Sequence, residues 1–212
     1  MTIVLIGPPA AGKTTAAGVV ARALCRDVVH VDMNRAQRYA PFGYTAARAD
    51  RLFEEGGARA LHRYEARFEA RVLAQEAGRH PEAVLDTGGG LLLQYADADV
   101  RRVGDALAAA DVTVLVLPHA GDPERSTRCL LARVRARGGG DASTVEWLDR
   151  GGESLLRALV RAGQAHLPVV DLVLDTAGPV PAVIPGGRRP GTPPADRIAT
   201  ALVDRPVRAV GR

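Results

Sequence analysis

Short apolar runs alternate along the chain with longer stretches that mix apolar and charged residues at helical spacing. Most of the runs consist of Val, Leu and Ile without a period of two, which is typical of parallel strands covered on both faces. The runs occupy residues 3–6, 28–31, 83–85, 112–117 and 169–174. The stretches between them predict helices over about 13–25, 45–78 (as one or two helices), 97–110, 123–137 and 143–165. This order predicts a three-layer α/β fold with a five-stranded parallel sheet.

The pattern changes after the last apolar run. Residues 178–194 contain six prolines and four glycines, which predicts a long irregular loop rather than a strand or a helix. A final helix is predicted over about 195–204, with a frayed tail over 205–212. Because 212 residues is the size of one domain, we expect residues 1–204 to form a single unit.

A glycine-rich stretch joins the first predicted strand to the first predicted helix. Residues 7–14 read Gly-Pro-Pro-Ala-Ala-Gly-Lys-Thr and match the pattern G-x-x-x-x-G-K-[ST]. In such a loop the backbone N–H groups surround phosphate oxygens, the lysine reaches the β- and γ-phosphates, and the hydroxyl binds Mg²⁺. The pattern predicts nucleotide binding by Gly7, Ala10, Ala11, Gly12, Lys13, Thr14 and Thr15, and Mg²⁺ binding by Thr14.

A glycine turn can match this pattern by chance, and Lys13 argues against that interpretation. It is the only lysine in a chain with 28 basic side chains, so arginine stands at every other basic position. The rigid guanidinium fork does not replace a compact ammonium group in a phosphate cradle. We therefore assign the sequence to the P-loop NTPase fold.

Polar residues follow two more of the predicted strands. Asp32 follows the second strand, and Asp86 follows the third, just before Gly88, Gly89 and Gly90. Ligands of open parallel sheets bind beyond the carboxyl ends of the strands, so these residues are expected near the phosphate loop. One carboxylate would organise Mg²⁺ and the other would take the proton of a substrate hydroxyl. Turn or helix-cap roles are the alternative for both aspartates.

Together with residues 52–57 and 173–176, these motifs resemble those of shikimate kinases in order and rough spacing, from residue 1 to about 178. Members of that family are compact enzymes that transfer the γ-phosphoryl group of ATP to a hydroxyl of a small cyclic acid, with Mg²⁺ and a closing lid. The resemblance implies ATP and Mg²⁺ as cofactors and a small hydroxylated molecule as acceptor. It also implies catalytic roles for Lys13 and Asp32.

The register of the second strand decides what Asp32 does. Counted without gaps from Lys13, Asp32 matches the family's substrate-hydroxyl aspartate and His30 its first, metal-side aspartate. A shift of two residues would put Asp32 on the metal side and Asn34 on the substrate side. We prefer the ungapped register because it keeps a carboxylate as the base. Asp86 would then bind the metal in place of His30.

The resemblance also gives the three glycines a role, since Gly88, Gly89 and Gly90 match a substrate-side triple glycine whose N–H groups face the acceptor. The next motif departs from the family. An arginine and a glutamate three residues apart hold the substrate carboxylate there, and residues 62–69 contain no such pair. Alignment to Glu69 puts Ala66 at the arginine position, and alignment to Glu65 puts His62 there.

Arg63 and Arg67 belong to a stripe of arginines spaced four residues apart. They either bind an acidic substrate or lie on a solvated helix face. We therefore expect an acceptor other than shikimate, such as a related polyol, amino acid or sugar. Arg161 lies near the position of the family's second substrate arginine and is a further candidate for substrate binding.

A mobile lid is predicted over about residues 133–150, where a basic helix runs into three glycines. Arg133 and Arg137 are candidates for neutralising charge on the transferred phosphoryl group, and we choose Arg137 as catalytic. An ordinary basic helix is the alternative. The adenine is expected near the loop over 178–194, where no contact can be assigned.

Composition and charge narrow the choice of partners. The net charge is +4 and the arginines are scattered, so no nucleic-acid-binding arm is expected. No apolar run approaches the ~18 residues of a membrane span, and the two cysteines, Cys25 and Cys129, indicate neither a disulfide framework nor a zinc site. We see no signal peptide and expect a cytoplasmic monomer or homodimer.

Two other functions remain open. A nucleoside or nucleotide kinase would need stacking aromatics around a base, for which Phe42, Tyr44, Phe53, Tyr64 and Phe68 are available. A nucleotide-binding regulatory module would bind ATP or GTP without transferring phosphate to a small molecule.

Overall fold

The computed structural model describes residues 1–139, 141–178, 181–187, 198 and 200. Within them one sheet has the strand order β2-β3-β1-β4-β5-β6. The first five strands are parallel, and β6 runs antiparallel to β5. This confirms the α/β fold with a parallel sheet and adds a sixth strand to the five predicted. The strands are β1 (Ile3–Ile6), β2 (Val28–His30), β3 (Val84–Asp86), β4 (Val112–Val116), β5 (Leu172–Asp175) and β6 (Ala182–Pro185).

The strand β6 corrects the prediction that residues 178–194 form only an irregular loop. Val183 and Ile184 pair with Leu174 and Val173 of β5. Proline within a strand is tolerated at the edge of a sheet, where its missing N–H interrupts no ladder, and β6 is such an edge. Residues 188–194, most of the helix predicted over 195–204 and the tail over 205–212 lie outside the described residues.

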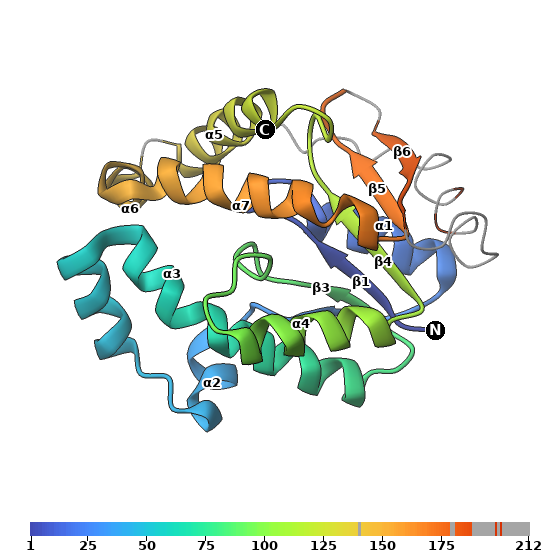
Figure 1. Ribbon diagram of the computed structural model, residues 1–212, viewed down its shortest axis with the longest axis horizontal. Coiled ribbons are helices and arrows are strands. Elements are labelled where there is room, and N and C mark those ends of the chain that lie inside the picture. Colours follow the sequence, from blue (N-terminus) through green and yellow to red (C-terminus); the bar gives the residue numbers. More distant parts are fainter. Residues whose placement is uncertain (140, 179–180, 188–197, 199, 201–212) are drawn as a thin grey trace.

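Helices cover both faces of the sheet, as Figure 1 shows: α4 and α7 pass in front of the strands, and α1 lies behind them. The α-helices are α1 (Lys13–Leu24), α2 (Arg35–Tyr39), α3 (Ala46–Arg79), α4 (Asp97–Ala109), α5 (Pro123–Gly138), α6 (Ala142–Trp147) and α7 (Glu153–Ala165). Shorter turns are η1 (Ala40–Phe42), the π-helical turn η2 (Leu148–Gly152) and η3 (Leu167–Val169). The single helix predicted over 143–165 is thus divided, because Gly151 has a φ of 91°.

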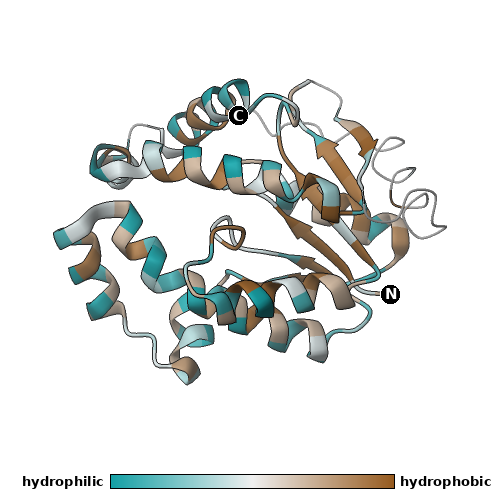
Figure 2. Ribbon diagram, viewed as in Figure 1, coloured by the Kyte–Doolittle hydropathy of each residue, from teal (hydrophilic) through white to brown (hydrophobic). Residues whose placement is uncertain are grey.

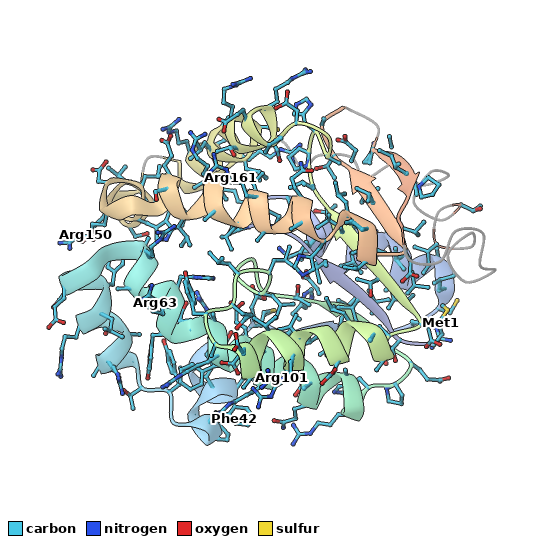
Figure 3. All side chains as sticks on the ribbon, in the orientation of Figure 1. Met1, Phe42, Arg63, Arg101, Arg150 and Arg161 are labelled. Carbon is cyan, nitrogen blue, oxygen red and sulfur yellow. The ribbon has the colours of Figure 1, made fainter. Side chains whose placement is uncertain are left out.

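A break in α3 shapes one side of the molecule. Gly57 has φ 65° and ψ −160° inside this 34-residue helix. A Cβ atom added there would lie 2.2 Å from the carbonyl oxygen of Arg150, so only glycine allows η2 to approach so closely. Arg150 Nη1 in turn donates to the carbonyl oxygen of Glu54 at 2.8 Å. In Figure 3, Arg150 lies where the segment around α6 meets the bend in α3. The predicted lid segment is therefore packed against α3.

The core consists mainly of aliphatic strand residues, which appear as brown strands between mixed helices in Figure 2. Every residue of β1 and β4 is buried. Each buried Val, Leu or Ile side chain stabilises the fold by about 1.5–3 kcal/mol relative to an exposed one. Because the strands are held on both faces, the loops at their carboxyl ends start from fixed positions. None of the described helices has the length and apolar character that would let it cross a membrane.

Candidate active site

A cavity of about 510 Å³ opens at the carboxyl ends of β1, β2 and β3. The loop after each strand contributes to its wall, as expected for an open parallel sheet. The contributing residues are Pro9, Ala10, Lys13 and Thr14 after β1, Asp32 and Arg35 after β2, and Thr87, Gly89 and Gly90 after β3.

Helices supply the other walls of this cavity. From α3 come two apolar and three polar side chains, and from α5 to α7 come one arginine, two hydroxyls and a group of apolar side chains. These residues are Ala58, Leu61, His62, Glu65 and Glu69 of α3, and Val134, Arg137, Ser143, Thr144, Trp147, Leu155 and Leu159 of α5, α6 and α7. Arg137, Ser143, Thr144 and Trp147 lie within the predicted lid.

The phosphate-loop geometry depends on two glycines with positive φ. Gly7 has a φ of 148°, and a Cβ atom there would lie 2.2 Å from the carbonyl oxygen of Val116 on β4. Gly12 has a φ of 102° and precedes α1, so the free N–H groups of the helix begin at Lys13. An anion in front of this helix would meet those N–H groups and the positive end of the helix dipole.

Lys13 lies at the centre of the electrostatics of the site. It is 7% exposed, and its Nζ donates to the carbonyl oxygen of Pro8 at 3.1 Å. Burial lowers the pKa of Lys13; Asp86, Asp32 and Glu69 oppose that shift, and Arg137 adds to it. Charges from β3, β2, α3 and α5 therefore all act on one ammonium group.

The outer side of the phosphate loop is braced by Arg133. Its guanidinium donates to the carbonyl oxygen of Ala10 at 3.4 Å, to Thr176 Oγ1 at 3.1 Å, and to the carbonyl oxygen of Thr176. The Thr176 hydroxyl donates to the carbonyl oxygen of Ala11 at 3.0 Å. Arg133 is thus held by the loop backbone, whereas Arg137, one turn further along α5, lines the cavity.

The two aspartates lie in different surroundings. Asp86 is 2% exposed. Its Oδ2 lies 2.9 Å from His30 Nδ1, and its Oδ1 has no hydrogen-bond partner within the described part of the chain. Asp32 is half-buried and lines the cavity, whereas Asn34 does not and instead precedes α2 with a φ of 55°. This placement favours the ungapped register for Asp32.

All three predicted substrate arginines lie away from the cavity. Arg63 and Arg67 are exposed on the opposite face of α3, where their guanidinium carbons lie 4.9 Å from the Tyr95 ring centre and 4.6 Å from that of Phe68. Arg161 has a 67% exposed side chain on α7 and pairs with Glu124 at 3.8 Å. Figure 3 labels Arg63 and Arg161 on these two helices. The prediction that these side chains bind substrate at this cavity does not fit their placement.

The glycine run lies tightly against α3. A Cβ atom on Gly88 would be 2.7 Å from Glu69 Oε1 and 3.4 Å from Asp32 Cβ, and one on Gly90 would be 2.6 Å from His62 Nε2. A Cβ atom on Gly89 would contact the Pro9 ring at 2.6 Å. The run therefore brings Asp32 and Glu69 together beside the phosphate loop, a packing role that the sequence did not reveal.

The most important cavity residues missing from the predicted site are Glu65 and Glu69. Burial and the nearby Glu65 raise the pKa of Glu69 to about 8, against the opposing effect of Arg35. Burial also raises the pKa of Glu65, against the effect of Arg35, whose Nη1 lies 2.9 Å from Glu65 Oε2. Their spacing of four residues places them on the buried face of α3. This spacing is the feature of the sequence from which their place in the site could have been predicted.

His62 favours the neutral form in this arrangement. Its Nε2 lies 3.0 Å from the carbonyl oxygen of Gly90, which can only accept, so Nε2 carries a hydrogen; in the neutral ring Nδ1 then accepts from the Tyr95 hydroxyl at 2.9 Å. Burial lowers the pKa of His62, which agrees with a neutral ring. His62 therefore positions the glycine run and adds no positive charge to the cavity.

No group of three or more His, Cys, Asp or Glu side chains suited to a metal ion is present among residues 1–139, 141–178 and 181–187. Mg²⁺ in phosphoryl-transfer sites commonly uses one or two protein ligands together with phosphate oxygens and water. The Thr14 hydroxyl at the cavity and the unpartnered Asp86 Oδ1 fit that smaller requirement.

No protein-family model matches the sequence, and a comparison with curated proteins gives no match. Among solved structures, the shikimate kinase from Aquifex aeolicus matches with a TM-score of 0.53 and 21% identity over 95% of this chain and 96% of that one. The chain has a shikimate-kinase-like P-loop fold. The shikimate kinase from Bacteroides thetaiotaomicron has a TM-score of 0.49 at 19% identity, covering 95% of this chain and 94% of that one. A gluconokinase from Sinorhizobium meliloti has a TM-score of 0.48 at 15% identity, with 96% and 89% covered.

Proposed function

We propose that the protein is an ATP-dependent kinase that phosphorylates a hydroxyl of a small metabolite other than shikimate. The observation that carries the proposal is that Lys13 and Asp32 line one cavity, with the amino end of α1 at its wall. A polyphosphate needs the ammonium and the helix N-terminus, and an acceptor hydroxyl needs a carboxylate within reach. Both requirements meet in this cavity.

The chain's own groups divide the chemistry between them. The N–H groups of the loop over residues 7–15 and Lys13 bind the β- and γ-phosphates, and Arg137 neutralises charge on the transferred group. Thr14 and Asp86 would hold Mg²⁺, which when bound neutralises the phosphate oxygens. Asp32 orients the acceptor hydroxyl and takes its proton. A bond forms between the hydroxyl oxygen and the γ-phosphorus as the bond to the β–γ bridging oxygen breaks, and ADP leaves with that oxygen.

The cavity offers little support for a nucleoside or nucleotide acceptor. Three of the five aromatic residues named for a base pocket pack on one another instead: Tyr44 stacks on Tyr64 with ring centres 5.5 Å apart, and Tyr64 meets Phe68 edge-on at 5.1 Å. Among the described residues that line the cavity, the only tryptophan or other large aromatic ring is that of Trp147. A small hydroxylated acceptor fits this wall better than a nucleobase, which requires aromatic or similar stacking partners.

The test is turnover of Mg·ATP by the purified protein with a panel of polyols, sugars, amino sugars, amino acids and hydroxy acids, with the phosphorylated product identified by mass spectrometry. We expect ADP release that depends on the acceptor, and its loss in Lys13→Ala and Asp32→Asn. Acceptor-independent hydrolysis alone would support a regulatory nucleotide-binding module instead. Undiminished transfer by Lys13→Ala would remove the kinase assignment.

A further inference from the structure

The acceptor end of the cavity carries more acidic than basic side chains. Asp32, Glu65 and Glu69 all line it, and Arg35 is the cation that faces them from α2. Arg35 is already engaged by Glu65, with Nη1 and Oε2 2.9 Å apart. Lys13 and Arg137 belong to the phosphate end, where the nucleotide's own negative charge would occupy them. Within the described residues, Asp32 and Glu69 therefore have no salt bridge.

Glu69 is the group that lacks a partner. It is 6% exposed, it lines the cavity, and its Oε2 has no hydrogen bond among the described residues. Its position is fixed by the glycine run, because a Cβ atom on Gly88 would be 2.7 Å from Oε1 and one on Gly90 would be 3.2 Å from Oε2. A buried carboxyl group held in this way gains most from an occupant that brings a hydrogen-bond donor or a positive charge.

An anionic acceptor has no comparable partner at this end. Burial favours the neutral form of His62, and Arg59, Arg63 and Arg67 of the same helix are exposed on its outer side. A carboxylate in this position would meet the acidic side chains Asp32, Glu65 and Glu69, and it would be desolvated without a cation of its own, because Arg35 is already paired with Glu65. The charge distribution therefore selects against an acid and in favour of a cation.

The remaining wall limits the shape of the acceptor. Leu61, Trp147, Leu155 and Leu159 give this wall apolar side chains. A compact ring with one apolar face would pack there, and the face of the Trp147 indole is also favourable for a cation. A flexible chain or a large base would use this wall less well.

We propose that the acceptor is a hydroxylated amine, such as an amino sugar or an aminocyclitol, whose ammonium group binds Glu69 and Glu65 while one of its hydroxyls lies at Asp32. This inference rests on the proposed kinase function, because it assigns the acceptor of the same site. The ammonium group of the acceptor would supply the hydrogen-bond donor that Glu69 lacks, and the ring of the acceptor would lie against Leu155 and Leu159.

The experiment compares matched acceptors on three proteins. Isothermal titration calorimetry with Mg²⁺ and a non-hydrolysable ATP analogue measures binding of glucosamine and N-acetylglucosamine, and of 2-deoxystreptamine, its N-acetylated form and shikimate. The proteins are the wild type, Glu69→Gln and Glu55→Gln. Glu69→Gln keeps the shape of the buried side chain and removes its ability to ionise and pair with an ammonium group. Glu55→Gln makes the same substitution at an exposed position of the same helix.

We expect at least one free amine to bind about 10-fold or more tightly than its acetylated partner and than shikimate. Glu69→Gln should lose this preference while its affinity for the nucleotide analogue stays within about two-fold, and Glu55→Gln should behave as the wild type. The inference is overturned if no free amine binds more tightly than its acetylated form, or if Glu69→Gln keeps the preference.

Turnover on the same panel separates the two proposals. Phosphorylation of shikimate or a neutral polyol, without preference for amines, would leave the kinase function standing and overturn the amine acceptor. Tight, Glu69-dependent amine binding without any phosphoryl transfer would support the charge selection of the site and contradict the kinase function.

Discussion

His30 Nδ1 lies 2.9 Å from Asp86 Oδ2, and the two residues face each other in the register of β2 and β3. The imidazole thereby holds one oxygen of a carboxyl group that is almost completely buried. The other oxygen, Oδ1, has no partner within the described residues. His30 thus orients Asp86 and leaves its other oxygen without a partner in the described part of the chain, which is the arrangement that the proposed Mg²⁺ role of Asp86 requires.

Asp86→Asn is expected to weaken the use of Mg·ATP. The substitution removes the largest of the charges that oppose the lowered pKa of Lys13, and it removes a proposed Mg²⁺ ligand. We expect kcat/KM for ATP to fall about 10-fold or more, and the Mg²⁺ concentration for half-maximal rate to rise several-fold. Steady-state kinetics at varied Mg²⁺ measure both. Asp27→Asn, at an exposed position before β2, is the control; an unchanged Mg²⁺ requirement in Asp86→Asn would exclude Asp86 from the metal site.

Alanine substitutions of Arg137, Arg63 and Arg161 are expected to have very different effects on kcat. Arg137 lines the cavity and acts electrostatically on Lys13, whereas Arg63 and Arg161 are exposed and lie outside its wall. Loss of a cation that stabilises a transferring phosphoryl group costs about 10²–10³ in rate. We expect that loss in kcat for Arg137→Ala, and activity within about two-fold of the wild type for Arg63→Ala and Arg161→Ala. Equal effects of all three substitutions would contradict the site described above.

The strand-end rule explains why part of this site could be predicted from the sequence. Lys13 and Asp32 follow apolar runs that can only be buried strands, so their convergence follows from the parallel order of the sheet. The arginine stripe was harder to interpret. Arg63 and Arg67 share a helix face with other arginines, and that face is exposed, whereas His62, Glu65 and Glu69 share the buried face with apolar residues. Charged residues on the apolar face of α3 were the better guide to the cavity.

Other features depended on contacts between distant segments. The strand β6 forms because Val183 and Ile184 find the free edge of β5, and the prolines around them hide that pairing in the sequence. The break of α3 at Gly57 reflects the approach of Arg150, almost a hundred residues later in the chain. The orientation of Asp86 depends on His30 in the neighbouring strand. Local patterns do not contain these contacts.

Gly90→Ala is expected to destabilise the protein and disturb the acceptor end. The new Cβ atom would lie 2.6 Å from His62 Nε2, which would have to move away from the carbonyl oxygen of Gly90. Overpacking of this kind costs about 1–3 kcal/mol in the free energy of unfolding. Gly104→Ala, in the exposed middle of α4 where a Cβ atom meets nothing within 4 Å, should instead stabilise by about 0.5–1 kcal/mol. Urea denaturation of the two variants measures the contrast, and a neutral Gly90→Ala would show that His62 can shift at no cost.

The pKa of Glu69 predicts a specific dependence of stability on pH. Its value rises from 4.5 to about 8 in the folded protein, so between these limits the folded state binds more protons than the unfolded chain. The free energy of unfolding therefore falls as the pH rises through this window, and the penalty from Glu69 is complete above pH 8. Glu69→Gln removes this penalty. The free energy of unfolding of the variant minus that of the wild type should therefore be close to its lowest value near pH 4.5 and should increase by about 2–4 kcal/mol toward pH 8.5.

Comparing two proteins cancels the contributions of titrating groups that do not interact with Glu69. His62 contributes with the opposite sign, because its pKa is lowered by burial, so its share of the stability increases as the pH rises toward its ordinary value of 6.5. That contribution is common to both proteins and drops out of the difference. Urea denaturation at several pH values between 4.5 and 9 measures the difference, and Glu55→Gln should give a flat line. If the Glu69→Gln difference is also flat, Glu69 is ionised in the folded protein throughout this range and already has a partner for its charge.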